Sequence, residues 1–326
     1  MRRVLSLLAV AGMTASAQAA IVVDGTVDAG YGAPKAVQTV ETQFGDASDP
    51  NGTGGGGELN AGYAVVRGNR LFVTLTGNQE GNFNKVSVFI DSVAGGENVL
   101  DGSLAYDFGD VSSNFGGLTF DSGFEADYHL FGRWGGGAYE LDIVNRAGST
   151  AGAELGNFGA ATVGTGTGVQ SGSILAGGTA TTGADGGVFL TQDVPFGFNN
   201  TNTAGVAGGT NAADQAAAAA VTTGLEFSIA LADIGSPAIG DTIKIHAAYG
   251  NGDNNFHSNQ ILGGLPAPQG NLGGDGGGNF TGNLAGIDFN QFAGDQFFSV
   301  VVPEPTSVAL MLIASVGGLS VRRRNG

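Results

Sequence analysis

The stretch AGYAVVRGNRLFVTLTGN, residues 61–78, predicts a β-hairpin. In its second half, Leu71, Val73 and Leu75 fall on one face of a strand, and the residues between them fall on the other. The segments 61–66 and 71–76 flank RGNR, in which Gly68 and Asn69 can take positive φ values in a tight turn. This period-two alternation around a short turn indicates an antiparallel sheet.

Further segments of the same kind follow along the chain. Strand candidates lie at 85–92, 123–132, 138–144, 224–231, 242–249 and 295–302. Glycine supplies 61 of the 326 residues, far above the usual share of about 7 %. Short strands joined by glycine-rich connections predict an all-β fold, an antiparallel β-sandwich of jelly-roll or immunoglobulin-like type with long Gly-rich loops.

One short helix is expected at 213–224, ADQAAAAAVTTG, with Asp214 or Asn211 as its N-cap and Gly224 as its stop. The segment 123–132 alternates Phe124, Ala126 and Leu130 with polar residues and predicts a strand that is buried on one face only. The Asn- and Gly-rich stretch 250–283 is expected to be a long loop.

The domain organisation is expected to be simple. Residues 20–301 are predicted to form a single β-sandwich domain. Residues 146–187 are rich in Gly, Ala and Thr and are interpreted as a poorly ordered insertion, with weak strands at a sheet edge as the alternative.

The N-terminal segment 1–19 has the features of a secretory signal helix. A basic head, an apolar run and small residues lead to the A-x-A pattern of Ala17 and Ala19. We therefore expect export through Sec-type machinery, with cleavage after Ala19 or Ala20.

The C-terminal segment 302–326 combines Pro303, Glu304 and Pro305 with an apolar run and the basic cluster Arg322, Arg323 and Arg324. As a helix, residues 307–321 would span about 22 Å, short of the ~30 Å hydrocarbon core. By length this hydrophobic helix would be a marginal, transient membrane anchor. A buried core helix is disfavoured by the terminal arginines and by the prolines that precede the run.

The same three parts, in this order, strongly resemble the PEP-CTERM sorting signal of Gram-negative-type bacteria. That resemblance implies recognition of Pro303, Glu304 and Pro305 by an exosortase-type processing enzyme, and a location at the cell envelope or outside the cell. It implies nothing about the activity of the rest of the chain, residues 20–303, which we call the body.

The charge of the body narrows the class of partner. Residues 20–303 carry 7 basic and 28 acidic side chains, a net charge of about −21. A surface with this negative charge repels nucleic acid and anionic lipid. We therefore expect neither as a partner of the body. The acidity has two interpretations: solubility outside the cell, or carboxylates that bind divalent cations such as calcium.

The sequence shows no pattern typical of catalysis. It contains no cysteine, and His129, His246 and His257 lie in unrelated segments without metal-ligand spacing. No G-x-S-x-G elbow and no G-K-[ST] phosphate loop occur. The protein is therefore predicted not to be an enzyme. A pair of carboxylic side chains facing a cleft would instead favour an enzyme.

Two sets of residues are candidate binding sites. Trp134, the only tryptophan, lies in a glycine-rich stretch and can either stack on a sugar ring or cap the sandwich core. Loop amides such as Asn259 and Gln260 can bind sugar hydroxyls or simply form turns. A weaker candidate is a calcium site at strand ends, formed by Asp91, Asp121, Glu125 and Asp127, for which solvated carboxylates are the alternative.

The body is weakly similar to DOMON-like and family 9-type carbohydrate-binding β-sandwiches. The similar stretches are IVVDGTVDAGYG, LNAGYAVVRGNRLFVTLTGN, KVSVFIDS and GLEFSIALADIG. The resemblance implies a sandwich that binds sugar or haem, but the chain lacks both the paired tryptophans of the sugar binders and a Met/His haem pair. Together these features predict an exported protein that binds extracellular polysaccharide; the alternative is a structural matrix or surface protein without a small-molecule ligand.

Overall fold

The computed structural model describes residues 19–45, 57–103, 113–146, 158–163, 169–177, 186–187 and 189–304. Ala17, Pro305 and the three terminal arginines lie outside these ranges, and with them the two terminal helices predicted from the sequence. Ala19, Pro303 and Glu304 are described and exposed. Within the described ranges, no helix is long and apolar enough to cross a membrane.

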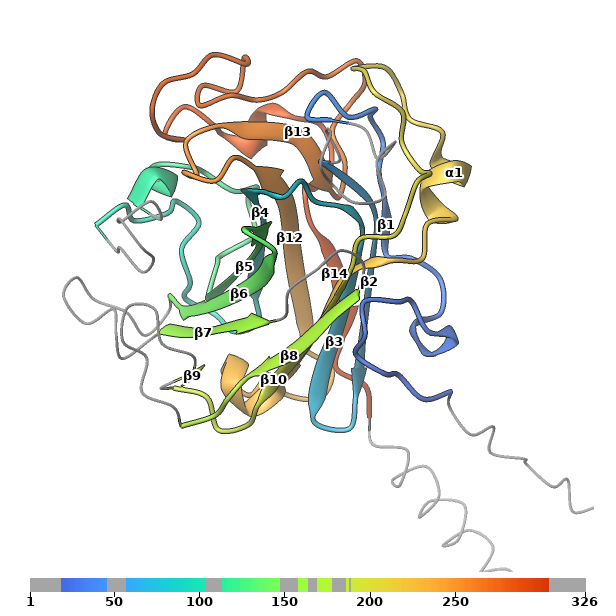
Figure 1. The fold of residues 1–326 in the computed structure, drawn as a ribbon. Helices are drawn as coiled ribbons and strands as arrows, with labels where there is room; N and C mark the ends of the chain where they lie inside the picture. The colour runs from blue at the N-terminus through green and yellow to red at the C-terminus, as the bar shows by residue number, and fades with distance from the viewer. Residues whose placement is uncertain are drawn as a thin grey trace, which may run out of the picture.

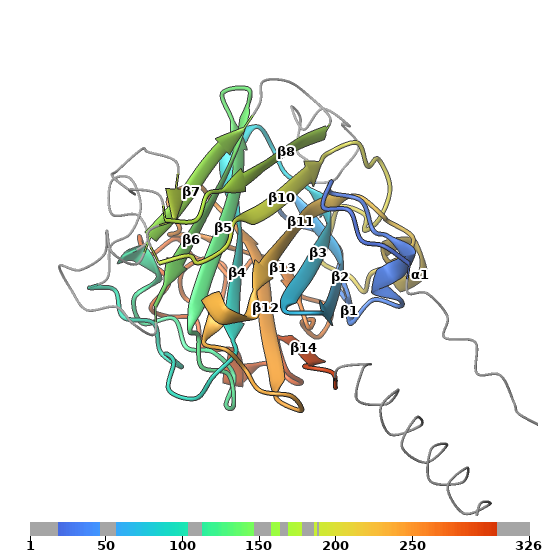
Figure 2. The same cartoon turned by 90° about the horizontal axis from the view of Figure 1, so that it is seen from below.

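Two antiparallel sheets form a β-sandwich, as the sequence predicts (Figures 1 and 2). The six-stranded sheet has the order β1–β2–β3–β11–β10–β8. Its strands are β1 (Ala36–Val37), β2 (Glu58–Arg67), β3 (Arg70–Asn78), β8 (Val169–Ile174), β10 (Val194–Asn199) and β11 (Gly224–Ala230).

The eight-stranded sheet has the order β13–β12–β4–β5–β6–β7–β9, and β14 pairs with β12 beside β13. Its strands are β4 (Asn82–Asp91), β5 (Tyr128–Gly135), β6 (Ala138–Asn145), β7 (Phe158–Val163), β9 (Gly186–Gly187), β12 (Thr242–Gly250), β13 (His257–Leu262) and β14 (Phe298–Val301). The short helices are α1 (Gln215–Ala219) and the 3-10 helices η1 (Ala29–Tyr31), η4 (Leu231–Ile234) and η5 (Phe289–Gln291).

The predicted hairpin is confirmed as β2 and β3. Arg67 pairs with Arg70 across a two-residue turn, and Gly68 takes a φ of 59° there. Leu71, Val73 and Leu75 are fully or almost fully buried between the sheets. We call the apolar cluster between the two sheets the inner core; it includes Leu71, Val73, Leu75, Val86, Val88, Ile90, Leu130, Ile143, Phe196, Phe227 and Ile245.

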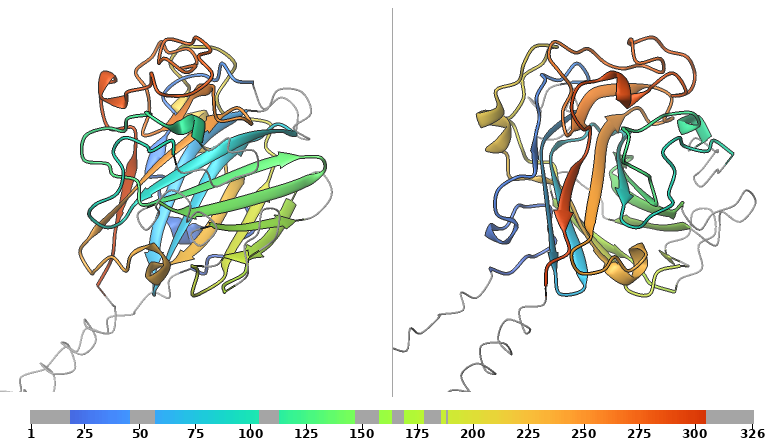
Figure 3. Two further views of the ribbon diagram at one scale, coloured as in Figure 1. Left: turned by 90° about the vertical axis from the view of Figure 1, so that its left-hand side faces the viewer. Right: turned by 180° about the vertical axis from the view of Figure 1, so that it is seen from behind.

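A second apolar cluster, the outer core, lies on the other face of the eight-stranded sheet. Loop segments from residues 92–103, 113–127 and 263–297 cover this face (Figure 3). The two segments also bind each other, because Thr119 donates its amide to Ile287 and accepts a hydrogen bond from the Phe289 amide. The outer core consists of Val40, Phe89, Leu100, Phe115, Leu118, Phe120, Phe124, Ala126, Ala248, Ile261, Leu265, Leu272, Leu284, Ile287 and Phe289.

The outer core corrects the prediction for residues 123–132. The strand begins at Tyr128 and is buried on both faces along its whole length. His129, on the face expected to meet water, is fully buried against Phe89, with ring centroids 4.0 Å apart. Leu130 faces the inner core, whereas Phe124 and Ala126, predicted on the same face, lie in the outer core. The period-two pattern does not show that loops cover the opposite face of the sheet.

Two further predictions need correction, and a third falls largely outside the described residues. Within 146–187, the segments 158–163, 169–174 and 186–187 form β7, β8 and β9 near the sheet edges, as in the alternative of weak edge strands, whereas 147–157, 164–168 and 178–185 lie outside the described ranges. The predicted loop 250–283 contains β13. The helix is shorter than expected: Asp214 caps it, as predicted, but it ends at Ala219, and Gly224 begins β11 instead of stopping a helix.

Candidate functional site

Trp134 does not offer a face to a ligand. Its side chain is 5 % exposed and belongs to the inner core, where it packs near Phe198. The turn of this hairpin is formed by Gly136 and Gly137, whose φ values are 59° and 85°. Trp134 therefore falls on β5 itself with its ring directed inward, and the core interpretation holds in place of the sugar-stacking one.

The predicted loop amides are also structural. Asn259 and Gln260 lie on β13 and are completely buried. Asn259 accepts the Gln43 amide through Oδ1 and donates through Nδ2 to the carbonyls of Glu41 and Gln269. Gln260 accepts the Leu59 amide through Oε1. Both side chains hold the segment at 38–43 and the sheet together, so neither is available to a glycan.

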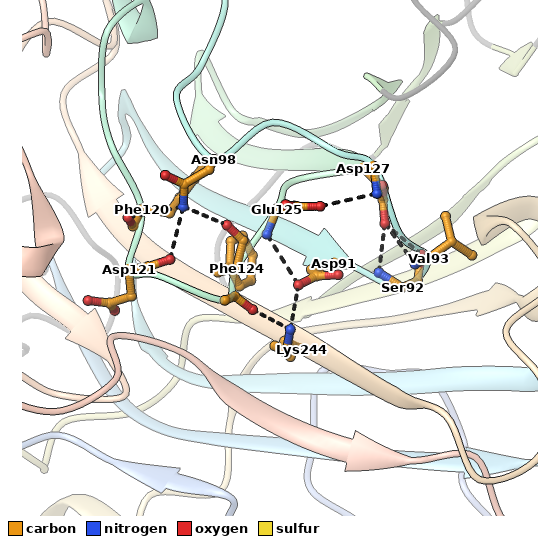
Figure 4. A network of polar contacts seen from close by, with 12 residues as sticks. Asp91, Ser92, Val93, Asn98, Phe120, Asp121, Phe124, Glu125, Asp127 and Lys244 are labelled. Carbon is orange, nitrogen blue, oxygen red and sulfur yellow. Dashed lines mark hydrogen bonds and ion pairs between the residues drawn. The ribbon is translucent and has the colours of Figure 1, made fainter.

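The four predicted carboxylates do lie near one another, at the end of β4 and in the segment that leads into β5 (Figure 4). Asp91 accepts hydrogen bonds at Oδ2 from the Lys244 ammonium, 2.8 Å away, and from the Glu125 amide, 3.2 Å away. Lys244 lies directly opposite Asp91 in the β12–β4 register and also donates to the Gly123 carbonyl. This cross-strand ion pair closes one side of the site.

Asp127 and Asp121 are buried anchors. Asp127 accepts the amides of Ser92 and Val93 at 2.7 and 2.9 Å, and Asp121 accepts the Gln296 amide at 2.6 Å. Removal from water raises the pKa of both carboxyls, and the amide hydrogen bonds oppose that rise. Each side chain fastens a loop of the outer layer to the sheet.

The four predicted carboxylates, all of them described, are not arranged to hold a calcium ion together. Among the described residues, no group of three or more His, Asp or Glu side chains is placed to hold a metal ion. The reason is that protein donors already occupy the predicted ligands: Lys244 binds Asp91, the Gly95 amide binds Glu125, and backbone amides bind the other two. The structure thus brings these residues together, but their carboxylates bind protein donors and hold the fold together.

An open, polar pocket of about 510 Å³ remains beside the ion pair. Its lining residues come from the end of β4, the segment before β5 and the start of β12: Asp91, Ser92, Val93, Ala94, Gly123, Glu125, Asp241, Thr242 and Lys244. Glu125, Asp241 and Thr242 are exposed, whereas Asp91 is 8 % exposed. The pocket therefore presents acceptors, a cationic donor and a hydroxyl to solvent.

Sequence reasoning identified Asp91 and Glu125 but missed Asp241, Thr242 and Lys244. A signal for Lys244 exists, because it is one of seven cations in the body and alternates with Ile243 and Ile245 on a strand. That alternation places Lys244 on the face opposite the inner core. Its pairing with Asp91, 153 residues away, depends on the strand order.

Comparison of the chain with protein-family models, with curated proteins and with solved structures finds no match.

Proposed function

We propose that this chain is an exported, non-catalytic β-sandwich protein of the bacterial cell envelope that binds extracellular polysaccharide. Export and sorting are supported by the signal-like segment 1–19 and by the segment 302–326, with its Pro-Glu-Pro motif and terminal arginines. Exosortase-type and Sec-type machinery are the partners that this proposal implies. Binding is supported by one structural observation, the open polar pocket beside Asp91 and Lys244.

The chemistry of the pocket suits sugar hydroxyls, each of which donates and accepts hydrogen bonds. Glu125 and Asp241 supply carboxylate acceptors, and Lys244 supplies the N–H that remains after its bonds to Asp91 and the Gly123 carbonyl. Hydrogen bonds to charged groups are stronger than those between neutral groups. The volume of about 510 Å³ lies within the range of small-ligand sites and is large enough for a short oligosaccharide.

Binding is favoured over hydrolysis. A glycosidase needs one carboxylic acid that donates a proton and a second carboxylate on the other side of the bond. In the pocket, Oδ2 of Asp91 is taken by Lys244, and Oε2 of Glu125 accepts the Gly95 amide. Asp127, whose pKa is raised by burial, does not line the pocket.

One observation favours the second candidate, a structural matrix or surface protein. The outer core covers a face of the larger sheet that would otherwise be open to a long polysaccharide chain. On that face, a ligand can then reach the sheet only at the ends of its strands. A protein with a covered sheet face can act as an inert building block.

Native gel electrophoresis through gels that contain single polysaccharides tests the proposal. We expect retardation of the purified protein by at least one polysaccharide, and roughly tenfold weaker retention for Glu125→Gln and Lys244→Met, since each loses a charged hydrogen bond. Lys35→Met, an exposed lysine near β1, is the matched control. No retardation in any gel favours the structural alternative, and full retention by both variants contradicts the pocket assignment.

Mass spectrometry of the cell-associated protein tests the sorting part. We expect mature chains that lack both the signal segment and Arg322 to Arg324. Mature protein that still carries these arginines contradicts processing at the C-terminal segment.

A further inference from the structure

Phe83 is an aromatic side chain that the structure holds out of both cores. Its side chain is 45 % exposed, although it lies near the start of β4, whose residues from Lys85 to Asp91 are all buried. Its φ is 67°, in the left-handed region that a bulky residue rarely adopts. Strain of this kind persists only where the surrounding structure enforces it, and it is concentrated at functional sites.

A β-bulge accounts for the placement of Phe83. Asn82 pairs with Gly135 and Lys85 pairs with Arg133, so two residues of β4 stand opposite one residue of β5. Bulges redirect a side chain from the regular alternation of a strand. Here the bulge sets Phe83 beside the β5–β6 turn and restores the regular alternation from Lys85 onward.

Two glycines provide the surface on which the Phe83 ring lies. A Cβ atom at Gly135 would come within 2.6–2.7 Å of three carbons of the ring, so any side chain there would occupy the space of the ring. At Gly136 a Cβ would approach the ring to 3.5 Å. The ring therefore rests against bare backbone on one side, and nearly half of the side chain remains exposed to solvent.

Polar side chains flank Phe83 in the chain. The side-chain amides of Asn82 and Asn84 donate through Nδ2 to Oε2 of Glu80, at 2.7 and 3.1 Å. The Gly252 amide donates to Oδ1 of Asn84 at 3.2 Å, which ties the β12–β13 connection to the same place. These contacts fix two side-chain amides and a carboxylate of residues close to Phe83 in the chain before any ligand arrives.

We propose that Phe83 is a stacking platform for a pyranose ring of an uncharged polysaccharide, with Glu80, Asn82 and Asn84 as its hydroxyl-binding rim. The apolar C–H face of a pyranose matches an exposed aromatic ring, and amides and carboxylates match its hydroxyls. An uncharged chain is the class that fits, because a body with a net charge of about −21 repels acidic polysaccharides.

This inference rests on the proposed function and adds a second contact region to it. Phe83 and the pocket beside Asp91 lie toward opposite ends of β4, at most about 27 Å apart along an extended strand. A single sugar cannot reach both. The two regions instead fit different parts of one long chain, or separate chains.

The test uses native gels that contain an uncharged polysaccharide, either galactomannan, dextran or laminarin, with alginate as the acidic comparison. We expect roughly threefold to tenfold weaker retention for Phe83→Ala and near-normal retention for Phe83→Tyr, which keeps the ring. Phe280→Ala is the matched control, because Phe280 is 65 % exposed in a different loop. Phe83→Gly, which permits the observed φ, provides a second ring-free variant whose backbone is not strained.

The outcomes separate the two proposals. Retention of wild type that Phe83→Ala and Phe83→Gly leave unchanged overturns the platform, while polysaccharide binding itself stands. An equal loss in Phe280→Ala also overturns it. Retention of the wild type by alginate alone contradicts the uncharged class, and no retention in any gel refutes the platform together with the proposed function.

Discussion

The inner and outer cores lie on the two faces of the same eight-stranded sheet, yet they are built differently. The inner core is made almost entirely of strand residues, mostly Leu, Val and Ile, from both sheets. The outer core takes most of its side chains from loops, and five of its fifteen members are phenylalanines. Two buried histidines, His129 and His246, pack among these rings. The difference teaches that a loop-built layer can bury a sheet face as completely as a second sheet does.

The largest expected effect comes from truncating one phenylalanine in each core. Phe227 and Phe120 are both buried, and either change to Ala should reduce the free energy of unfolding by about 3–5 kcal/mol if the whole molecule unfolds together. We expect the full loss only for Phe227→Ala. The outer layer is joined to the sheet through loops, so Phe120→Ala should open that layer locally.

Hydrogen exchange distinguishes the two cases. For Phe120→Ala, we expect faster exchange at the amides of Leu118 and Phe289 and unchanged protection in β3 and β11. A uniform loss of protection in both variants would show that the two cores unfold as one unit.

A somewhat smaller effect is expected at the point where the outer layer begins. Asp127→Ala leaves the buried amides of Ser92 and Val93 without their acceptor and should cost about 3 kcal/mol. Asp127→Asn keeps an acceptor oxygen and should cost clearly less. Chemical denaturation of both variants provides the measurement, and equal losses would contradict the anchoring role.

Acid should weaken the outer core before the inner core. Burial lowers the pKa of His246 to about 3 and that of His257 to about 4, and it lowers the pKa of His129 as well, with help from the nearby charges of Arg146 and Lys85. The unfolded chain protonates these groups near pH 6.5. Below that value the unfolded state binds more protons, so stability is complete above about pH 6.5 and falls as the pH decreases toward 4.

His129→Leu isolates this effect. No hydrogen-bond partner of either His129 ring nitrogen is found within the described residues, so the change removes titration without breaking a described hydrogen bond. We expect little change at pH 7.5 and a gain of about 2 kcal/mol at pH 5 relative to wild type, at roughly 1.4 kcal/mol per pH unit. Urea denaturation at the two pH values measures it, and an equal effect at both would contradict a neutral buried histidine.

The smallest effect concerns Phe83, which belongs to neither core. Phe83→Gly should raise the free energy of unfolding by about 1 kcal/mol, because glycine adopts a φ of 67° without strain. Thermal unfolding of this variant and of Ser236→Gly, another residue with positive φ, gives a matched pair. A clear loss of stability for Phe83→Gly would indicate that the ring is needed for the fold.

Much of the inner core could be predicted from the sequence. The alternation in 71–76 and 86–90 identifies the residues that face it, and the alanine run after Asp214 indicates the helix. The positions of Trp134, Asn259 and Gln260 could not be predicted, because their surroundings in the sequence are rich in turn-forming residues. The hairpin turn at Gly136 and Gly137, and the pairing of β13 with β12, place these side chains inside.

The candidate site was predicted in part. Asp91 follows a clear strand, and Glu125 and Asp127 lie close together before another, so their meeting at one end of the sheet is accessible to pattern reasoning. The protein groups that bind these carboxylates cannot be predicted from local patterns. The sequence alone does not indicate that Lys244 meets Asp91 or that Asp121 binds the Gln296 amide.

The sequence by itself determined many of the strands, the inward face of those at 71–76 and 86–90, and the acidity of the body, because these depend on local alternation and on composition. Only the tertiary structure decided that loops cover the larger sheet, that the carboxylates bind protein donors and that Phe83 remains exposed. Each of these depends on contacts between segments far apart in the chain, and strand order and register, which no local pattern contains, bring those segments together.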